Sequence, residues 1–439
     1  MISPHRRREI IDALRRGTVP QQGLDALAVG TERYATAIGD ELDGVAAGGA
    51  GFKAVRGEWG SGKTFTVRWI AELARSRGFA TAEVQISEGE TPLHHLETVY
   101  RRLCERLTTS DSPSGTALQT VVDSWFYALH DDVVSSGSVA TDDSASLLDA
   151  STTLAEQRLG DVARRAPALA AVLRAYRQAL ADNRVADAQG LLAWLGGQPH
   201  VAASIKRTAG IRGDLDHDGA LAFLGGLLTI LRGAGYSGLV LVLDEVETLQ
   251  RVRRDTRDRA LNAMRQLIDE VDQGRFPGLY LMITGTPAFF DGPQGASRLP
   301  PLAQRLHTDF TTEARFDNPR AVQLRLPGFD LSALVEVGGR VRDLYAAGAS
   351  DPERIRRVCD DEYVRILAQA VTGDLGGRVG VAPRLFLKKL VGDVLDRVDQ
   401  FAEFDPRADY ELTVVDGELS DVERNARAAA SVDEIDLDL

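Results

Sequence analysis

The chain has 439 residues, of which 44% are hydrophobic and 26% charged, so it is long enough for two or three domains with large cores. Its net charge of −13 argues against a protein that coats nucleic acid, and no apolar run is long enough to span a membrane. The first residues lack the apolar core of a secretory signal, and Cys104 and Cys359 lie far apart, so we expect a protein of the reducing cytoplasm.

The hydrophobic pattern predicts strands that alternate with helices in two separate parts of the chain. The first part is expected to contain helices over 4–16 and 32–45, strand 52–56, a glycine loop over 57–62, a helix to residue 77, strand 80–87 and a helix over 92–107. The second is expected to contain helix 218–233, strand 238–244, helix 255–273, strand 278–284, helix 300–307 and strand 322–326. Because the strands are almost continuously apolar, they predict a parallel sheet with helices on both faces.

Three further segments lack this alternation. Residues 108–217 are almost wholly helical and predict an insertion into the α/β fold, and residues 328–405 predict a separate helical domain. From residue 411 to the end there are nine acids and two arginines, so we expect 406–439 to be a poorly ordered acidic tail. The expected divisions are 1–50 for the N-terminal helices, 51–107 and 218–327 for the two parts of the core, and the three segments just named.

The sequence "GEWGSGKT" matches the phosphate-binding motif G-x-x-x-x-G-K-[ST] in full and lies between an expected strand and an expected helix. Glycines allow successive backbone N–H groups to turn toward phosphate oxygens, and the helix adds its positive end. Lys63 is expected to reach the β- and γ-phosphates, and the Thr64 hydroxyl to bind Mg²⁺. The predicted ligands are therefore ATP and Mg²⁺. The residues predicted to bind the nucleotide here are Gly57, Glu58, Trp59, Gly60, Ser61, Gly62, Lys63, Thr64 and Phe65.

A second motif predicts hydrolysis as well as binding. The apolar strand "LVLVLD" ends at Asp244, which is expected to hold the Mg²⁺ ion, and Glu245 is expected to orient or deprotonate the attacking water. Glu247 is a weaker candidate, because the residues after the strand can simply be solvated. Thr284 or Thr286, at the end of the next strand, could bind the γ-phosphate or the water, although threonine is also an ordinary strand residue.

An arginine-rich segment follows the acidic pair. It contains Arg251, Arg253, Arg254, Arg257 and Arg259, with Asp255 and Asp258 between them. One interpretation is contact with a DNA backbone or an adjacent subunit; the other is a solvated helix face with internal ion pairs. The sequence leaves both open.

These motifs resemble those of the AAA+ ATPases, particularly the branch of origin-recognition and signal-transducing ATPases. The segment "LAVGTERYATAIGDEL", with Val29 and Gly30, is similar to the family's segment that closes over adenine. The segment "LPPLAQRLHTDF" resembles the arginine-finger segment, which makes Arg305 the finger, with Arg298 as a competitor. The segment "GVAPRLFLKKLV" resembles the lid helix that carries the sensor arginine; the candidate is Arg384, with Lys388 or Lys389 as alternatives.

The resemblance implies an AAA+ P-loop fold with an αβα sheet and a helical lid, and a self-oligomer, ring or dimer, in which each finger completes a neighbour's site. The segments "RGEWGSGKT", "LDEVETLQRVR" and "TGTPAFFDGPQG" further resemble the ATP-binding proteins of bacteriophage-exclusion (BREX) defence systems, over residues 6–400. This implies an antiviral ATPase that acts with a helicase and other defence components. Two alternatives remain: an ATP-binding switch with slow turnover, and a helicase loader that contacts DNA.

Overall fold

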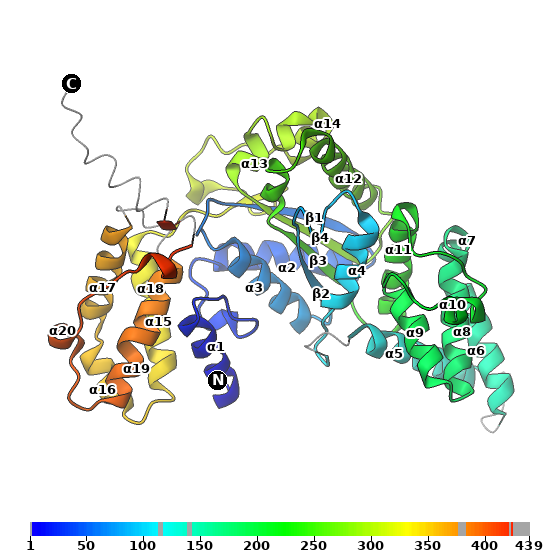
Figure 1. Ribbon diagram of the computed structural model, residues 1–439, viewed down its shortest axis with the longest axis horizontal. Coiled ribbons are helices and arrows are strands. Elements are labelled where there is room, and N and C mark those ends of the chain that lie inside the picture. The colour runs from blue at the N-terminus through cyan, green and yellow to red at the C-terminus, as the bar shows by residue number, and fades with distance from the viewer. Residues whose placement is uncertain (1, 113–116, 138–142, 376–382, 421–422, 425–439) are drawn as a thin grey trace.

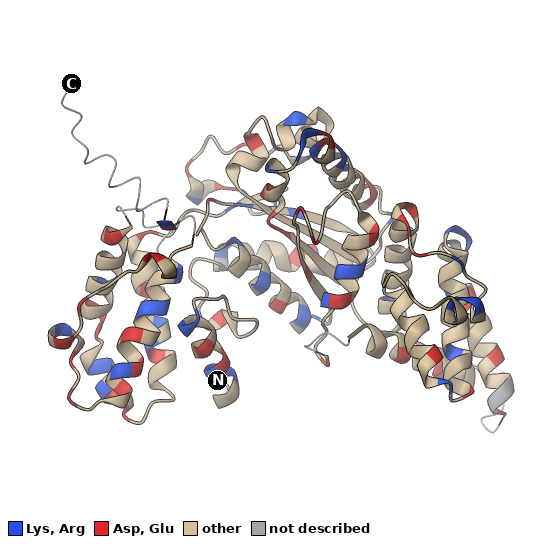
Figure 2. Cartoon of the chain, viewed as in Figure 1, with Lys and Arg blue, Asp and Glu red and all other residues tan. Residues whose placement is uncertain are grey.

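The computed structural model describes residues 2–112, 117–137, 143–375, 383–420 and 423–424. Three parts follow one another along the long axis of the molecule (Figure 1). A central α/β core lies between a helical insertion at one end and a C-terminal helical domain at the other. Charged residues of both signs are spread over the helices of all three parts, whereas the central strands are largely uncharged (Figure 2).

The core is built on a five-stranded sheet, and all its pairings are parallel, which confirms the predicted parallel sheet. The strands are β1 (Gly51–Arg56), β2 (Ala80–Gln85), β3 (Leu239–Asp244), β4 (Leu279–Gly285) and β5 (Gln323–Arg325), in the spatial order β2-β3-β4-β1-β5. Every residue of β3 and β4 is buried, as expected for central strands covered on both faces. The strand expected to reach residue 87 ends at Gln85, because Ser87 closes a turn with Thr91 through a 3.2 Å hydrogen bond.

Alternate residues of the strands bury two different groups of helices. Leu241 and Leu243 of β3 pack on the face covered by α4 (Leu96–Arg106), α11 (His217–Gly233) and α12 (Arg254–Asp272). Val240 and Val242 pack on the opposite face, against α2 (Glu32–Ala46) and α3 (Lys63–Ser76). The sheet is thus the middle layer of an αβα sandwich.

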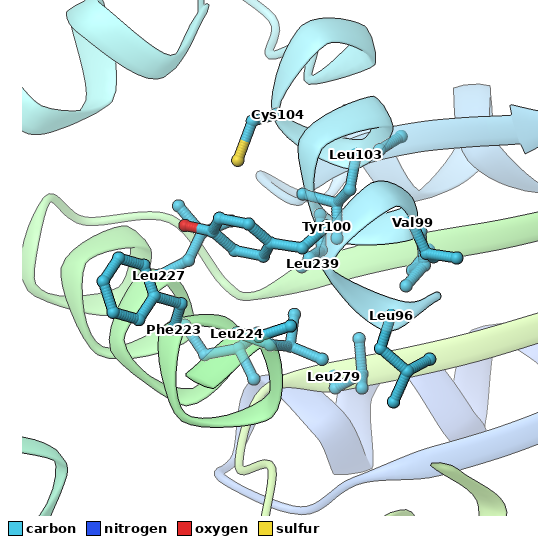
Figure 3. Close-up of a cluster of buried hydrophobic side chains, with 14 of the residues drawn as sticks. Leu96, Val99, Tyr100, Leu103, Cys104, Phe223, Leu224, Leu227, Leu239 and Leu279 are labelled. Atoms are coloured by element: carbon cyan, nitrogen blue, oxygen red, sulfur yellow. The ribbon is translucent and has the colours of Figure 1, made fainter. Parts of the chain in front are cut away.

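The helices α4 and α11 pack against each other over the sheet (Figure 3). Leu96, Val99, Tyr100 and Leu103 of α4 meet Phe223, Leu224 and Leu227 of α11 above Leu239 and Leu279. The rings of Tyr100 and Phe223 are 5.9 Å apart and perpendicular, and the Tyr100 hydroxyl donates to the carbonyl of Leu195 at 3.1 Å. This layer therefore joins the sheet to the inserted helices.

The segment inserted between α4 and α11 is helical in its described residues. It consists of α5 (Ala117–Ser135), α6 (Ser144–Leu159), α7 (Asp161–Arg165), α8 (Pro167–Ala181), α9 (Val185–Leu195) and α10 (Ala203–Thr208). Its apolar interior is continuous with that of the core, because Trp194 of α9 contacts Phe223 of α11 with ring centroids 5.5 Å apart. A shared interior of this kind fixes the insertion to the α4–α11 layer.

The C-terminal helical domain has an apolar interior of its own. It contains α15 (Leu331–Ala346), α16 (Pro352–Val358), α17 (Asp361–Asp374), α18 (Pro383–Lys389), η6 (Leu390–Leu395), α19 (Asp396–Gln400), α20 (Pro406–Asp409) and η7 (Asp416–Glu418). The remaining short elements are η1 (Leu24–Ala26), η2 (Val246–Gln250), α13 (Pro287–Asp291), η3 (Ala296–Arg298), α14 (Pro300–Leu306) and η4 (Ala314–Phe316).

The first helix of the chain, α1 (Pro4–Arg15), packs on this C-terminal domain rather than on the sheet. Ile10, Ile11 and Leu14 are buried in the interior of the domain, and the Arg15 guanidinium donates to both oxygens of Asp396 at 2.6 and 2.8 Å. Two segments more than 300 residues apart in the sequence therefore form one helical unit.

Part of the segment expected to be a poorly ordered acidic tail is instead folded onto the same domain. Val414 and Leu419 are buried in its apolar interior, and the Tyr410 hydroxyl donates to Asp393 at 3.2 Å. Burial of these apolar side chains stabilises the docked segment. The ion pairs of Glu418 with Lys388 and Lys389 balance part of its negative charge. Residues 425–439 of the expected tail lie outside the described residues.

Candidate functional site

The loop after β1 has the backbone conformation that the glycine motif predicts. Gly60 and Gly62 have φ angles of 81° and 87°, a region that favours glycine, and a Cβ at Gly57 would lie 2.2 Å from the Ser61 hydroxyl oxygen. The backbone N–H of Gly57 donates to Gly285 of β4 at 3.1 Å, and α3 begins at Lys63. The loop therefore lies at the carboxyl edge of the sheet with a helix N-terminus behind it, the arrangement that binds phosphate.

The Lys63 ammonium is buried inside this loop. Its Nζ atom donates to the carbonyls of Gly57 at 2.9 Å and Glu58 at 3.2 Å, and lies 3.7 Å from a carboxylate oxygen of Glu247. Burial lowers the pKa of Lys63, and the nearby Glu247 carboxylate acts in the opposite direction.

Asp244 ends β3 and joins three elements through its carboxylate. Thr64 donates to one oxygen at 3.2 Å, while the Thr284 hydroxyl of β4 and the backbone N–H of Glu245, at 3.1 Å, donate to the other. Burial raises the pKa of Asp244, and the hydrogen bond from Thr284 opposes this. The buried carboxylate and the Thr64 hydroxyl are hard oxygen ligands close enough to share one ion, so this pair fits Mg²⁺.

The carboxylate of Glu245 is hydrogen-bonded to a neighbouring strand. Glu245 has a φ angle of 59°, which turns the chain sharply after β3, and its side chain accepts a 2.8 Å hydrogen bond from Gln85 at the end of β2. Its backbone N–H lies 3.0 Å from the Thr284 hydroxyl. Glu245 is thus at the expected edge of the sheet but bonded to a neighbouring strand.

A cavity of about 820 Å³ lies beside the loop, between the core and the C-terminal helical domain, and its size is suitable for a nucleotide. Its lining comes from segments within 14–34, 59–66, 244–251, 326–337 and 383–423. The lining includes Val29, Gly30, Asp244, Glu245 and Arg384 together with Trp59 through Phe65, so these predicted residues meet around one space. Gly57 and Glu58 lie behind them and present their carbonyls to Lys63.

The segment that carries Val29 and Gly30 is fixed to α3. The Glu72 carboxylate accepts hydrogen bonds from the backbone N–H groups of Gly23 at 2.6 Å and Leu24 at 2.8 Å. The Trp69 indole donates to Asp25 at 2.6 Å. The helix that follows the phosphate loop therefore also positions the side of the cavity expected to receive adenine.

Arg384 is the one of the three sensor candidates that lines the cavity among the described residues. Its guanidinium pairs with the buried Glu423 carboxylate and donates to the Glu418 carbonyl at 2.6 Å. Lys388 and Lys389 instead pair with the Glu418 carboxylate, at 3.3 and 2.7 Å. The acidic C-terminal segment thus contacts all three cations.

The two predicted threonines and the two candidate finger arginines all lie outside the described lining of the cavity. Arg305, on α14, pairs with Asp269 of α12, and Arg298 pairs with Asp258 at 2.5 Å. The Thr286 hydroxyl caps α13 by accepting the N–H of Phe289 at 3.4 Å, so its position is that of a helix cap rather than a ligand. The Thr284 hydroxyl donates to the Asp244 carboxylate and accepts from the backbone N–H of Glu245.

The arginine-rich segment divides into residues with different surroundings. Arg257 donates to three backbone carbonyls, those of residues 249, 250 and 252, which is a structural role. Arg259 pairs with Asp255 at 3.6 Å, whereas Arg253 and Arg254 are exposed. The interpretation as an ion-paired helix face therefore fits Arg259, and contact with DNA or a neighbouring subunit stays open for Arg251, Arg253 and Arg254.

Two residues of this site were missed or undervalued from the sequence. Gln85 gave no signal beyond being a polar residue at the end of a predicted strand. Glu247 was a weaker candidate because residues after the strand can be solvated, but its side chain is only 3% exposed and faces Lys63. Burial raises the pKa of Glu247, and the charge of Lys63 opposes this.

A parallel αβα sheet, a phosphate loop after β1 and a buried aspartate at the end of β3 define the class of P-loop nucleotide-binding proteins. A family model described as BREX system ATP-binding protein BrxC/D matches residues 2–414, and the chain belongs to this family. No curated protein and no solved structure matches the chain. Among the described helices, none combines the length and apolarity that a bilayer crossing requires.

Proposed function

We propose that the protein is a Mg²⁺-dependent ATPase of AAA+ architecture, of the BrxD type within its family, that acts in the cytoplasm in defence against phage. One observation carries the proposal: Lys63, Thr64 and Asp244 meet at one edge of the sheet, with the Thr64 hydroxyl 3.2 Å from the Asp244 carboxylate. A lysine inside a glycine loop and a hydroxyl–carboxylate pair are the groups that a metal-bound triphosphate requires.

Each residue has a definite task in this proposal. The loop amides and Lys63 bind the β- and γ-phosphates, and Thr64 and Asp244 would hold Mg²⁺, which would neutralise phosphate charge. Thr284 orients the Asp244 carboxylate by its hydrogen bond. Glu245 accepts a proton from the attacking water, for which its carboxylate must leave Gln85 and turn toward the γ-phosphate.

The remaining charge at the γ-phosphate is proposed to come from other parts of the assembly. The C-terminal helical domain acts as a lid that closes through Arg384, which already lines the cavity. Arg305 is a third exposed and lies outside the cavity of its own chain, so it would serve the site of a neighbouring subunit. Lid closure would then change the contacts that the oligomer makes with a helicase or another defence protein.

The test is ATP binding and phosphate release by two variants. Lys63→Ala is expected to lose binding or turnover, whereas Glu245→Gln should bind ATP and lose at least about 100-fold in turnover, as removal of a general base does. A Glu245→Gln protein that hydrolyses ATP at the parental rate would remove the catalytic assignment.

A second candidate function is an ATP-binding switch with slow turnover. It is favoured by the internal partners of the key side chains, since Gln85 bonds Glu245, Glu247 pairs with Lys63, and Arg384 is engaged by the C-terminal segment. Comparison of single-turnover with steady-state kinetics separates the two functions. A switch is expected to hydrolyse its bound ATP slowly and release ADP more slowly still.

A helicase loader would need a surface that binds DNA. Arg253 and Arg254 are exposed at the start of α12, but basic residues are interspersed with acidic ones over the helices in view (Figure 2). ATP-dependent DNA binding whose salt dependence weakens when both arginines are changed to alanine would support this function.

A further inference from the structure

Glu247 lies between the catalytic strand and the phosphate loop. The left-handed backbone at Glu245, with φ 59°, turns the chain after β3 into the short helix η2. As a result, the Glu245 carboxylate is hydrogen-bonded to Gln85, whereas the Glu247 side chain faces Lys63, although both glutamates line the cavity. The two glutamates of the motif therefore have different partners.

The only cationic group within 4 Å of the Glu247 carboxylate, among the described residues, is Lys63, with Oε1 3.7 Å from Nζ. Neither carboxylate oxygen accepts a hydrogen bond from another described side chain or backbone group. The carboxylates of Asp244 and Glu245 lie nearby and disfavour a third negative charge at Glu247. A buried carboxylate in such surroundings is stabilised mainly by its counter-ion.

Lys63 donates hydrogen bonds to two loop carbonyls, those of Gly57 and Glu58, and the Glu247 carboxylate lies 3.7 Å from its ammonium. At that distance Glu247 is an ion-pair partner of Lys63 rather than a hydrogen-bond acceptor. A phosphate that approaches the ammonium therefore competes with Glu247 for its charge. The carboxylate is the partner that a phosphate most resembles in charge and geometry.

We propose that Glu247 is a positioning residue that holds Lys63 in the empty site and that the phosphates of the nucleotide displace it. The inference rests on the proposed function, in which Lys63 binds the β- and γ-phosphates. Displacement leaves an unpaired buried carboxylate close to the phosphates, so Glu247 weakens nucleotide binding and speeds the release of ADP. Glu247 thus favours exchange of ADP for ATP after each turnover.

The test compares the wild type with Glu247→Gln, which keeps the shape of the side chain and removes its charge. The probe is a fluorescent ADP analogue in the presence of Mg²⁺, displaced by ADP, ATP or AMP. We expect ADP and ATP to bind about tenfold more tightly, mainly through slower dissociation. AMP should not gain affinity, because it lacks the phosphates that Lys63 contacts. Asp255→Asn is the control for net charge, since Asp255 is exposed on α12 outside the cavity.

Unchanged or weaker ADP binding by Glu247→Gln overturns the inference, and so does an equal gain for AMP, which would indicate a change of cavity shape. If that variant does not fold, a crystal structure of the wild type with ADP and Mg²⁺ decides. The inference requires Lys63 to have left Glu247 for the β-phosphate, and an intact ion pair contradicts it. A wild type that binds no nucleotide refutes the proposed function itself, whereas one that binds and hydrolyses ATP while Glu247→Gln behaves identically refutes only the role of Glu247.

Discussion

The Gln85 amide lies 2.8 Å from the carboxylate of Glu245 and holds it at the end of the neighbouring strand β2. The β2–β3 register pairs Gln85 with Asp244, and Glu245, the proposed water-activating residue, directly follows Asp244 in the chain. Because Glu245 must reach the γ-phosphate to act as a base, this hydrogen bond favours a state that is not competent for hydrolysis.

Substitution of Gln85 by alanine is therefore expected to raise basal ATP turnover. The exposed hydrogen bond is worth about 1 kcal/mol, which corresponds to a gain of roughly fivefold. Steady-state phosphate release at saturating ATP measures the effect, and the melting temperature should fall by no more than about 3 °C, because Gln85 is exposed. A fall in turnover would mean that Gln85 instead helps Glu245 to act.

Substitutions of the two candidate threonines are expected to impair different properties, Mg²⁺ affinity for Thr284 and stability for Thr286. Thr284→Val removes the hydroxyl that orients the Asp244 carboxylate and should weaken the apparent affinity for Mg²⁺ by about 10- to 100-fold. Thr286→Val removes the cap of α13 and should lower stability by about 1 kcal/mol. Titrations of Mg²⁺ in the ATPase assay, with thermal unfolding beside them, distinguish the two. Equal Mg²⁺ dependence of Thr284→Val and wild type would refute the orienting role.

The raised pKa of Asp244 should affect how the stability of the nucleotide-free protein depends on pH. Because burial raises this pKa above the ordinary value of about 3.9, the folded protein binds the proton more strongly than the unfolded chain. Stability contributed by this group thus falls as the pH rises from about 4 through the raised pKa. Asp244→Asn should unfold at a higher temperature than the wild type at pH 7, with a difference that shrinks toward pH 4. A less stable variant at pH 7 contradicts the prediction.

The proposed role of Arg305 can be tested by mixing two inactive variants of the protein. Lys63→Ala lacks a working loop but keeps its arginine, whereas Arg305→Ala has an intact loop but lacks the finger. If the finger acts on a neighbour, mixing the two inactive variants should restore part of the ATPase activity. Mixtures of Arg298→Ala with Lys63→Ala test the competing arginine in the same way. Mixtures that stay as inactive as their components would exclude action between subunits.

The layout of the core could be predicted because its signals are local. Strands β3 and β4 are continuous apolar runs, and the phosphate motif stands between a strand and a helix, so the sequence neighbours of Lys63 already specify its setting. The Asp244–Glu245 pair was recognisable for the same reason, since it directly follows a buried strand.

The contacts that modulate the site could not be predicted, because their partners are distant in sequence. Gln85 and Glu245 are 160 positions apart and meet only because β2 pairs with β3. Glu247 is buried through the left-handed turn at Glu245, which no motif specifies. Likewise, α1 joins the C-terminal domain through Arg15 and Asp396, 381 positions apart, a packing choice that helical periodicity does not determine.

The central claim is that the loop from Gly57 to Thr64 binds the phosphates of ATP beside Asp244. A crystal structure of Glu245→Gln with ATP and Mg²⁺ tests it most directly. We expect the β- and γ-phosphates to lie inside the loop, with Lys63 on their oxygens and Mg²⁺ bound by Thr64 and Asp244. An empty loop in crystals grown at an ATP concentration that saturates the protein in solution, or a nucleotide bound elsewhere, would contradict it.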